Sequence, residues 1–268
     1  LVGKKPLIFT NNDSAYETAL EFKKQGIDPI ILDTREEHSS DLIDSVKNQN
    51  IKIRFSYAVI AANGYKKVQS AQIGKLNKNK TAFENSETIE CDCICVSGFW
   101  TPTVHLASQS GNKLKFDDQI DAFVPDKSKQ NETSVGASKG TFTLKDTLDD
   151  GFKTGFDLSK KITNNNNSTL PPNVNEIKKN PHDKFWCSPL PKDKNFKRFV
   201  DFQNDVAVSD IEIALREGYR SIEHVKRYTT LGMATDQGRT SNLNGLQLVA
   251  NVEKKIVPQV GHTTFRPP

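Results

Sequence analysis

The sequence predicts an α/β protein in which a parallel sheet covered by helices is followed by a smaller, mostly helical domain. Two observations support this fold class: the first sixty residues alternate short apolar runs with amphipathic stretches, and helical periodicity returns from residue 196 onward. Between them, residues 163–195 are rich in Asn, Pro and Lys, a composition typical of a long loop. We therefore expect an α/β domain at 1–160, a linker at 161–195 and a helical domain at 196–268.

The first domain is predicted to begin with a strand, a helix and a second strand, at residues 6–10, 14–24 and 28–33. Gly26 ends the helix, because glycine accepts the left-handed backbone at which helices commonly close. A second helix at 40–48 leads into three more strand patterns, which predict a hairpin-like addition to the parallel sheet. These three strand patterns cover 51–64, 66–76 and 88–98. A further strand-like pattern follows at 132–137, and a helix is predicted near 144–152. The helical domain is predicted to contain helices near 209–217, 221–227 and 244–252.

The composition is that of a folded protein without a marked preference for a polyanion or a lipid surface. The hydrophobic fraction is 35% and the formal net charge is +4, with a pI of about 8.7, and the lysines are scattered rather than clustered with aromatics. We therefore expect no nucleic-acid partner. The sequence has no run of ~18 apolar residues and no signal peptide, so we expect no membrane span and a cytoplasmic location. The missing initial Met and the ending FRPP predict a segment of a longer polypeptide.

Three of the four cysteines form a C-x-C-x-C pattern, Cys91, Cys93 and Cys95, within TIECDCICVSG. If this stretch is a single strand, the three side chains share one face and their sulfurs lie about 7 Å apart. A tetrahedral metal site needs its sulfurs closer together, each about 2.3 Å from one ion. We interpret the three residues as small apolar core residues, a use of cysteine that fits a reducing compartment.

The stretch FTNNDSAYETA stands where a Rossmann phosphate loop would connect the first strand to the first helix. The fingerprint has glycine at the tight turn and at the pyrophosphate, and a small residue where helix meets strand; Thr10, Asn12 and Ala15 occupy these positions. Only Ala15 meets its requirement, because Asn12 places a Cβ where the pyrophosphate approaches. Asp33 stands where an acid holds a ribose hydroxyl, and nearby Arg35 would suit a 2′-phosphate. The alternative is that Asp33 simply caps a strand end.

Three stretches resemble the α subunit of heterotetrameric, tetrahydrofolate-linked sarcosine oxidase: TNNDSAYETA, SGFWTPTVHLASQSGNKLKFD and the run from VDFQND to GRTSN. The resemblance covers nearly the whole chain and is densest over residues 199–245. It implies a nested dinucleotide-binding fold of the two-dinucleotide reductase type, with an FAD/NAD(P)-binding-like domain at 1–160. Residues 1–100 would be the inserted Rossmann-like unit and 101–160 the return to the outer unit. A C-terminal folate-binding domain, absent from this sequence, would follow.

The resemblance also implies a reaction and its cofactors. In the family, sarcosine is oxidatively demethylated to glycine, with hydrogen peroxide and either formaldehyde or 5,10-methylenetetrahydrofolate as products. FAD and FMN are held mainly by the β subunit, the α subunit binds NAD non-covalently, and γ and δ subunits complete the complex. SVGASKGTFTL would lie beside the NAD, where amides at a helix start suit a phosphate or ribose oxygen. The implied contacts are Ala137, Thr141, Phe142, Thr143 and Leu144, unless this is an ordinary buried strand–turn–helix.

The helical domain resembles the [2Fe–2S] domain of bacterioferritin-associated ferredoxin, which carries two cysteine pairs. By register, the four ligand positions are occupied here by Asp201, Gln203, Asp236 and Ser241. Because such clusters are held by thiolates, or by two thiolates and two imidazoles, we expect no cluster in this chain. We expect the four side chains to hydrogen-bond one another and backbone amides, with Arg239 pairing with either aspartate. A Mg²⁺ ion on the two carboxylates is the alternative.

The stretch EHVKRYTT precedes this loop and carries cations and hydroxyls suited to a flavin phosphate. We expect Lys226, Arg227, Thr229 and Thr230 to contribute to the FMN interface; the alternative is a solvated basic helix end favoured by the helix dipole. His105, His182, His224 and His262 show no ligand spacing, and the sequence offers no nucleophile–base arrangement, so we expect no catalytic residue. By the resemblance, the fragment lacks the β subunit, the outer phosphate loop and the folate domain, so we expect no activity of the fragment alone. Two rival interpretations are the α subunit of a related amino-acid or opine dehydrogenase, and a scaffold that holds subunits together without a cofactor.

Overall fold

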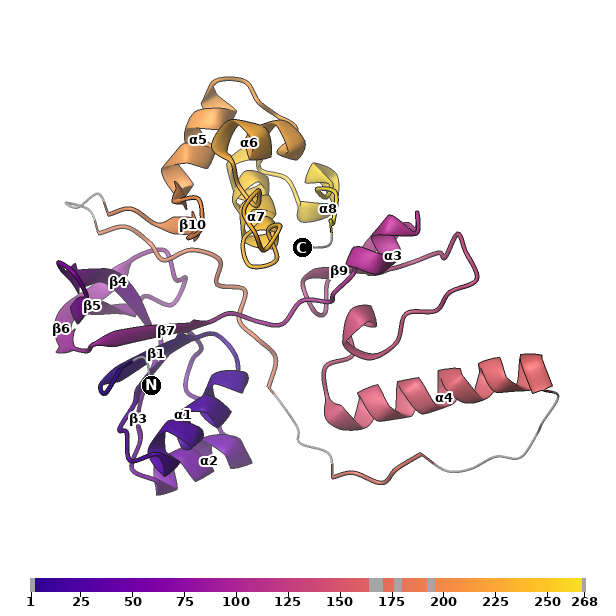
Figure 1. The fold of residues 1–268 in the computed structure, drawn as a ribbon. Helices are drawn as coiled ribbons and strands as arrows, with labels where there is room; N and C mark the ends of the chain where they lie inside the picture. The colour runs from indigo at the N-terminus through magenta and orange to yellow at the C-terminus, as the bar shows by residue number, and fades with distance from the viewer. Residues whose placement is uncertain (1–2, 164–170, 176–179, 192–195, 267–268) are drawn as a thin grey trace. The chain divides into compact units, whose positions relative to one another are not determined.

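The computed structural model describes residues 3–163, 171–175, 180–191 and 196–266. The chain forms two compact units (Figure 1). The first consists of the described residues within Leu1–Phe99 and Lys178–Arg198, and the second of those within Trp100–Ile177 and Phe199–Pro268. The α/β domain expected at 1–160 is thus divided at Phe99, and its last sixty residues group with the helical part.

The first unit is built on a parallel sheet with the strand order β3-β2-β1-β7. The strands are β1 (Pro6–Thr10), β2 (Ile30–Asp33), β3 (Lys52–Phe55) and β7 (Cys93–Ser97). Two helices, α1 (Ser14–Lys24) and α2 (Asp41–Asn48), pack on one face of this sheet. Ser40 caps the N-terminus of α2, because its hydroxyl accepts a hydrogen bond from the Ile43 amide. The core between helices and sheet contains Ile8, Ala15, Tyr16, Ala19, Ile31, Ile43, Val46 and Ile51.

An antiparallel sheet covers the other face, so the first unit has three layers; it is a separate sheet rather than the predicted hairpin-like addition to the parallel one. Its strands are β4 (Tyr57–Gly64), β5 (Val68–Leu76) and β6 (Phe83–Glu90), in that order. The core on this side contains Leu7 and Leu32 from the parallel sheet and Ala71, Ile73 and Cys91 beside the antiparallel one. Burial on both faces explains the continuous apolar sequences of β1 and β2.

Two strand predictions in this unit were wrong at their boundaries. The pattern at 51–64 is broken at Ser56, whose positive φ of 58° ends β3 and lets β4 leave the parallel sheet. The pattern at 88–98 is also two strands, because β6 ends at Glu90 and β7 begins at Cys93. Cys91 therefore lies outside the strand that carries Cys93 and Cys95, and the sulfurs of those two are 3.7 Å apart rather than the predicted ~7 Å.

The second unit begins with irregular structure around short elements. These are α3 (His105–Gln109), the β8–β9 hairpin (Leu114–Asp117 and Ala122–Pro125) and a 3₁₀ turn, η1 (Gly136–Lys139). The strand expected at 132–137 is not formed, because Gly136 has a φ of 62° and begins the turn. The helix expected at 144–152 is instead the twenty-residue α4 (Leu144–Thr163), none of whose residues is buried.

The C-terminal part of this unit is a small helical assembly, as predicted. A short antiparallel pair, β10 (Phe199–Asp201) and β11 (Val206–Ala207), leads into α5 (Val208–Arg216), α6 (Ile222–Thr229), α7 (Asn242–Glu253) and α8 (Val257–Val260). Helix α5 packs against both α6 and α7. The buried residues between these helices include Ile211, Ala214, Val225, Leu246 and Val249. Among the described helices of the whole chain, none is long and apolar enough to cross a lipid bilayer.

Candidate functional site

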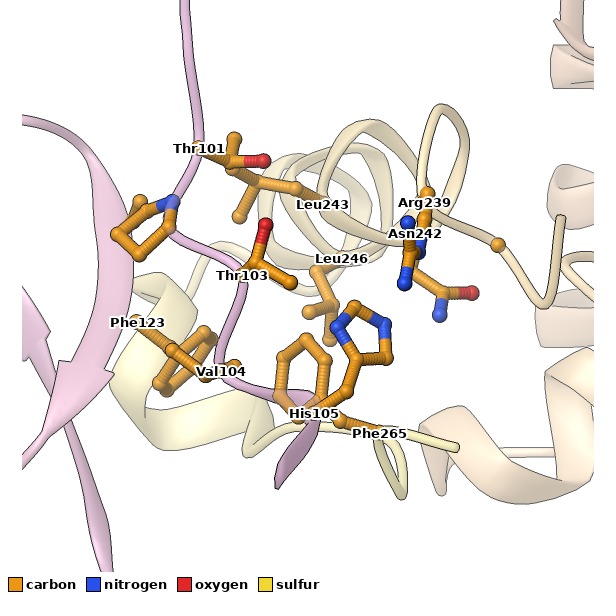
Figure 2. Close-up of a pocket in the computed structure, with 13 residues that line it drawn as sticks. Thr101, Thr103, Val104, His105, Phe123, Arg239, Asn242, Leu243, Leu246 and Phe265 are labelled. Carbon is orange, nitrogen blue, oxygen red and sulfur yellow. The ribbon is translucent and has the colours of Figure 1, made fainter. Parts of the chain in front are cut away.

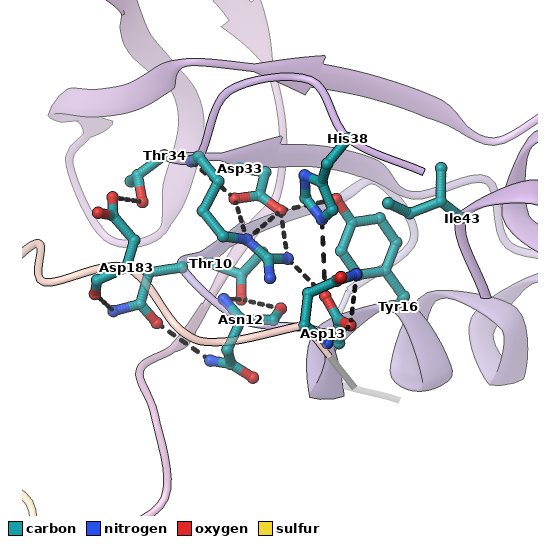
Figure 3. Close-up of polar contacts among 12 residues, drawn as sticks. Thr10, Asn12, Asp13, Tyr16, Asp33, Thr34, His38, Ile43 and Asp183 are labelled. Carbon is teal, nitrogen blue, oxygen red and sulfur yellow. Dashed lines mark hydrogen bonds and ion pairs between the residues drawn. The ribbon is translucent and has the colours of Figure 1, made fainter. Parts of the chain in front are cut away.

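The loop after β1, at the position of a Rossmann phosphate loop, is closed by the side chain of Asn12 (Figure 3). Its Nδ2 donates to the Gly98 carbonyl oxygen at 2.6 Å, and its Oδ1 accepts from the Ser14 amide at 2.9 Å. The Thr10 hydroxyl accepts from the Asn12 amide at 3.2 Å. The amide group of Asn12 thus links the β1 loop to the end of β7, where a glycine fingerprint would leave room for a pyrophosphate.

Asp33, the candidate ribose ligand, is fully buried and bonded to protein groups instead (Figure 3). Tyr16 donates its hydroxyl to Oδ2 at 2.7 Å, and the Arg35 guanidinium donates to the same oxygen at 2.7 Å. The guanidinium also pairs with Asp13, again at 2.7 Å. Burial would lower the pKa of Arg35, but the two carboxylates outweigh it and raise the pKa. Burial and the Asp33 carboxylate raise the pKa of Tyr16.

The two sequence interpretations of this pair therefore need correction. Asp33 is more than a cap at a strand end, since it anchors a buried ion-pair network. Arg35 is committed to two carboxylates and to the Pro181 carbonyl oxygen, so its guanidinium is not free for a 2′-phosphate.

The described segment 180–191 lies over the same edge of the sheet, although it was expected to be a linker. Asp183 accepts from the Thr34 hydroxyl at 2.7 Å, and its backbone exchanges hydrogen bonds with Asn11. The Asn180 amide donates to Asp13 Oδ2 at 2.8 Å. Ring contacts continue the attachment: Phe185 lies edge-on to Phe9, and His182 stacks on Phe99 with ring centroids 4.3 Å apart. The chain itself thus occupies the carboxyl end of β1 and β2, where a dinucleotide would lie.

The five expected NAD contacts surround the N-terminus of α4 in the second unit. Thr143 caps this helix, because its hydroxyl accepts from the Asp146 amide at 3.1 Å. The Thr141 carbonyl oxygen accepts from the Thr147 hydroxyl at 3.0 Å, which holds the turn before the helix. Thr141, Phe142 and Thr143 are half-buried, whereas Ala137 and Leu144 are exposed.

The turn before α4 is fixed by Asp150, which the sequence did not single out. Its carboxylate accepts from the Gly136 amide at 2.9 Å and pairs with Lys139 at 2.8 Å. The Lys139 ammonium, together with the Gly136 amide, lowers the pKa of Asp150. Gly136 is required here, because a Cβ at this positive φ would also lie 2.8 Å from the Thr147 side chain.

The expected FMN residues lie at the C-terminal end of α6, but not all of their side chains are free to contact a ligand. The Thr229 hydroxyl donates to the Val225 carbonyl oxygen at 2.8 Å, and Thr230 adopts a left-handed φ of 64° that ends the helix. Arg227 is exposed and Lys226 half-buried. The pKa of Lys226 is lowered by burial and by the Arg266 charge, against the opposite effect of Glu223.

The loop that resembles a cluster-binding loop is held by two aspartates. Asp201 is buried; it accepts from the Gly232 amide at 2.8 Å and the Gln203 amide at 2.9 Å, and more distantly from the Ser241 hydroxyl at 3.4 Å. Asp236 accepts from the Gly238 amide at 3.0 Å and the Thr240 hydroxyl at 2.8 Å.

These contacts bear out part of the expected network. Asp201 and Ser241 bond each other, and both aspartates bind backbone amides, whereas the exposed Gln203 contributes only its backbone. Burial would raise the pKa of Asp236, but the Thr240 hydroxyl, the two amides and the Arg239 charge together lower it. The described residues contain no group of three or more His, Cys, Asp or Glu side chains placed to hold a metal ion.

A small pocket in the second unit was missed by sequence reasoning (Figure 2). It has a volume of about 90 Å³, well below the roughly 300–1,000 Å³ of a typical small-molecule site. Within the part of the chain that the structure describes, His105 Nδ1 and Asn242 Oδ1 are buried without a hydrogen-bond partner. Burial and the Arg239 charge lower the pKa of His105. The lining residues include Thr101, Thr103, Val104, His105, Phe123, Arg239, Asn242, Leu243, Leu246 and Phe265.

The chain has an α/β fold, with a parallel sheet in its first unit and a helical part at the end of its second unit. It matches the crystal structure of L-proline dehydrogenase from P. horikoshii with a TM-score of 0.59 and 15% identity, covering 99% of this chain and 48% of that one. Residues 195–268 match the family model of the sarcosine oxidase A3 domain.

The sequence comparison identifies more specific relatives than the fold does. The chain is 32% identical to the sarcosine oxidase subunit alpha of Rhizobium meliloti (strain 1021) over 99% of its own length and 26% of that subunit. The corresponding subunit of Corynebacterium sp. (strain P-1) is 30% identical over 99% of this chain and 28% of its own length. The chain is thus homologous to sarcosine oxidase α subunits and spans about a quarter of their length.

Proposed function

We propose that the chain is the middle section of a sarcosine oxidase α subunit, in which it serves as an NAD-binding scaffold and contributes to the flavin and subunit interfaces. The observation that carries this proposal is the homology to named α subunits over 99% of the chain. The match of the helical part to the A3 domain of the same enzyme supports it independently.

In the proposed complex, sarcosine is oxidised to glycine, and hydrogen peroxide is formed together with formaldehyde or 5,10-methylenetetrahydrofolate. The amine chemistry takes place at FAD in the β subunit, and electrons pass to FMN at the α/β interface. This chain supplies no catalytic residue and acts with β, γ and δ subunits in the cytoplasm. Its contribution is to hold the nucleotide and flavin in place.

We propose that NAD binds at the start of α4 rather than on the parallel sheet of the first unit. Three features of the first unit support this choice. The Asn12 side-chain amide closes the phosphate loop, the Arg35 guanidinium is bonded to the Asp33 carboxylate, and the segment 180–191 lies over the strand ends. At α4, in contrast, amides of a helix start and the partly exposed Thr141 are available for a phosphate or ribose oxygen, whereas the hydroxyl of Thr143 is bonded to Asp146 and would have to exchange that bond for one to the nucleotide.

We propose that FMN meets this chain at Lys226 and Arg227. Within the described residues, neither cation takes part in an ion pair. The lowered pKa of Lys226 reflects burial and the repulsion of Arg266, both of which a phosphate would offset. Thr229 has a lesser role, since its hydroxyl is already bonded to the helix backbone.

The test is to produce the whole α subunit with its partner subunits and to measure oxygen consumption and bound nucleotides. Sarcosine-dependent oxygen uptake with one NAD per α subunit supports the proposal. Thr143→Ala and Lys139→Ala are the matched pair, because only Thr143 is among the proposed NAD contacts. Loss of NAD from the first variant alone is expected. Turnover of proline or an opine in place of sarcosine would assign the chain to the related dehydrogenases. A complex that contains no NAD would favour the interpretation of the chain as a scaffold without a cofactor.

A further inference from the structure

Cys93 and Cys95 form a close thiol pair at the edge of the parallel sheet. They are two residues apart on β7 and therefore point to the same face, and their Sγ atoms are 3.7 Å apart. Both side chains are half-buried. The two remaining cysteines are placed differently: Cys91 is buried outside the strand, and Cys187 lies in the segment 180–191.

The two thiols of the pair have different environments. Cys95 packs against the core beneath α1 and α2. Burial, a hydrogen bond with Cys93 and the charge of that neighbour raise the pKa of Cys95 to about 11. Cys95 therefore keeps its proton at neutral pH and is poorly suited to be the first nucleophile. Cys93, the first residue of β7, is the thiol at which an oxidant would act.

We propose that Cys93 and Cys95 are a redox-active thiol pair that hydrogen peroxide converts into an intrachain disulfide. In the first step the Cys93 thiolate attacks a peroxide oxygen, the O–O bond breaks, and sulfenic acid and hydroxide form. In the second step Cys95 sulfur attacks the Cys93 sulfenic sulfur, the S–O bond breaks, and the Cys95 proton leaves with the hydroxyl as water. Peroxide is reduced by two electrons and the two thiols are oxidised by two.

The strand geometry allows this bridge only with a local movement. Alternate Cα atoms of an extended strand lie roughly 6.7 Å apart, at the upper limit of about 6.8 Å that disulfides tolerate. In the described part of the sheet β7 is an edge strand that pairs with β1 alone, so its outer side is free to shift. A bridge held at this limit is reopened readily by small thiols, which makes the modification reversible.

The proposal does not depend on the role of the chain in sarcosine oxidation, because the oxidant is added in the experiment. The intact, fully reduced protein is treated with one equivalent of hydrogen peroxide, free thiols are then blocked, and the peptide Thr81–Lys113 is analysed by mass spectrometry after tryptic digestion without reduction. We expect this peptide to lose two hydrogens, with the bridge assigned to Cys93 and Cys95 by fragmentation. Cys187, beside the Arg198 guanidinium, lies on another tryptic peptide, so its oxidation is followed separately.

Variants separate the two steps. In Cys95→Ser the Cys93 sulfenic acid should accumulate and be trapped by dimedone, whereas Cys93→Ser should give neither trapped acid nor bridge. Cys187→Ser is the matched control and should form the bridge at the wild-type rate. Wild-type protein whose Cys93 and Cys95 stay reduced, or are oxidised without forming the bridge, would overturn the proposal. The wild-type measurement decides the question even if a variant fails to fold, and far-ultraviolet circular dichroism checks the variants.

Discussion

Thr34 donates its hydroxyl proton to the carboxylate of Asp183, with Oγ1 and Oδ2 2.7 Å apart, although the two residues are 149 positions apart in the sequence. The same carboxylate pairs with Lys80, so three distant parts of the chain meet at one side chain. This contact helps to hold the segment 180–191 at the strand ends, together with the contacts of Asn180 and Phe185. The segment 180–191 fills the space at the carboxyl ends of β1 and β2, where a dinucleotide would otherwise bind.

Replacing Asp183 with Ala should release this segment locally. The Thr34 hydroxyl and Lys80 lose their shared acceptor, at a cost of about 1–2 kcal/mol, which corresponds to roughly tenfold more frequent opening. Trypsin should then cut after Lys184 about ten times faster. Asp28→Ala is the control, since it removes a solvent-exposed ion pair with Lys23 and should leave cleavage at Lys184 unchanged. Equal cleavage in all three proteins would show that Asp183 does not hold the segment.

Replacing Asp201 with Ala should destabilise the helical part of the second unit. The buried Gly232 amide loses its acceptor, and the expected loss is about 2–3 kcal/mol of unfolding free energy. Asp236→Ala should cost less, about 1 kcal/mol, because Asp236 is half-exposed and water replaces its contacts. Urea denaturation of both variants measures the difference. Anaerobically purified wild-type protein should contain no stoichiometric iron, and one cluster per chain would refute our assignment of Asp201 as a hydrogen-bonding residue.

Two glycines with positive φ distinguish backbone strain from steric conflict. A Cβ at Gly238 would lie 2.2–2.4 Å from the side-chain amide of Asn242, whereas a Cβ at Gly218 meets nothing within 4 Å. Gly218→Ala should therefore cost only the left-handed backbone strain, about 1–2 kcal/mol. Gly238→Ala should cost at least about 3 kcal/mol, since Asn242 must move as well. Similar melting temperatures for the two variants would mean that the loop adapts and that its shape is not fixed by this contact.

His105 should make the stability of the second unit depend on pH. Its folded-state pKa lies below 6.5, so near that pH the unfolded chain binds more protons than the folded one. Stability is therefore retained above pH 6.5 and lost as the pH falls through the lowered pKa. His105→Gln should abolish this part of the pH dependence in urea denaturation between pH 8 and about 5.

The Arg239 charge supplies a second check on the same histidine. In Arg239→Ala the repulsion disappears, and the His105 pKa measured by NMR titration should rise toward its ordinary value. Arg216→Ala, at the end of α5, serves as the control and should leave the titration unchanged. A His105 pKa that does not respond to either substitution would mean that burial alone lowers it.

The sequence predicted those parts of the fold whose cause is local. Period-two and helical patterns located β1, α1 and α2. The Asp201–Ser241 contact, between residues 40 positions apart, was expected only because of the family resemblance. Ser56 was missed because serine is not a residue that favours a left-handed φ, and only the tertiary structure makes it turn the chain.

What the sequence could not supply were contacts between distant side chains. Nothing near Asp183 indicates Thr34 as its partner, and the pocket around His105 combines residues that are more than a hundred positions apart. The Cys93–Cys95 distance was wrong for a different reason. Strand spacing fixes the Cα positions, whereas the side-chain rotamers bring the two sulfurs together.

The network at the strand ends has the wrong electrical sign for a nucleotide diphosphate. Asp13, Asp33 and Asp183 bring three carboxylates, against which stand the cations of Arg35 and Lys80. These five side chains together sum to one negative charge. A diphosphate brought to this edge would meet net repulsion, and the desolvated aspartates could not easily be screened by salt. The ion-paired groups at the strand ends thus disfavour a diphosphate at this edge by their charge, in addition to the space that the segment 180–191 takes.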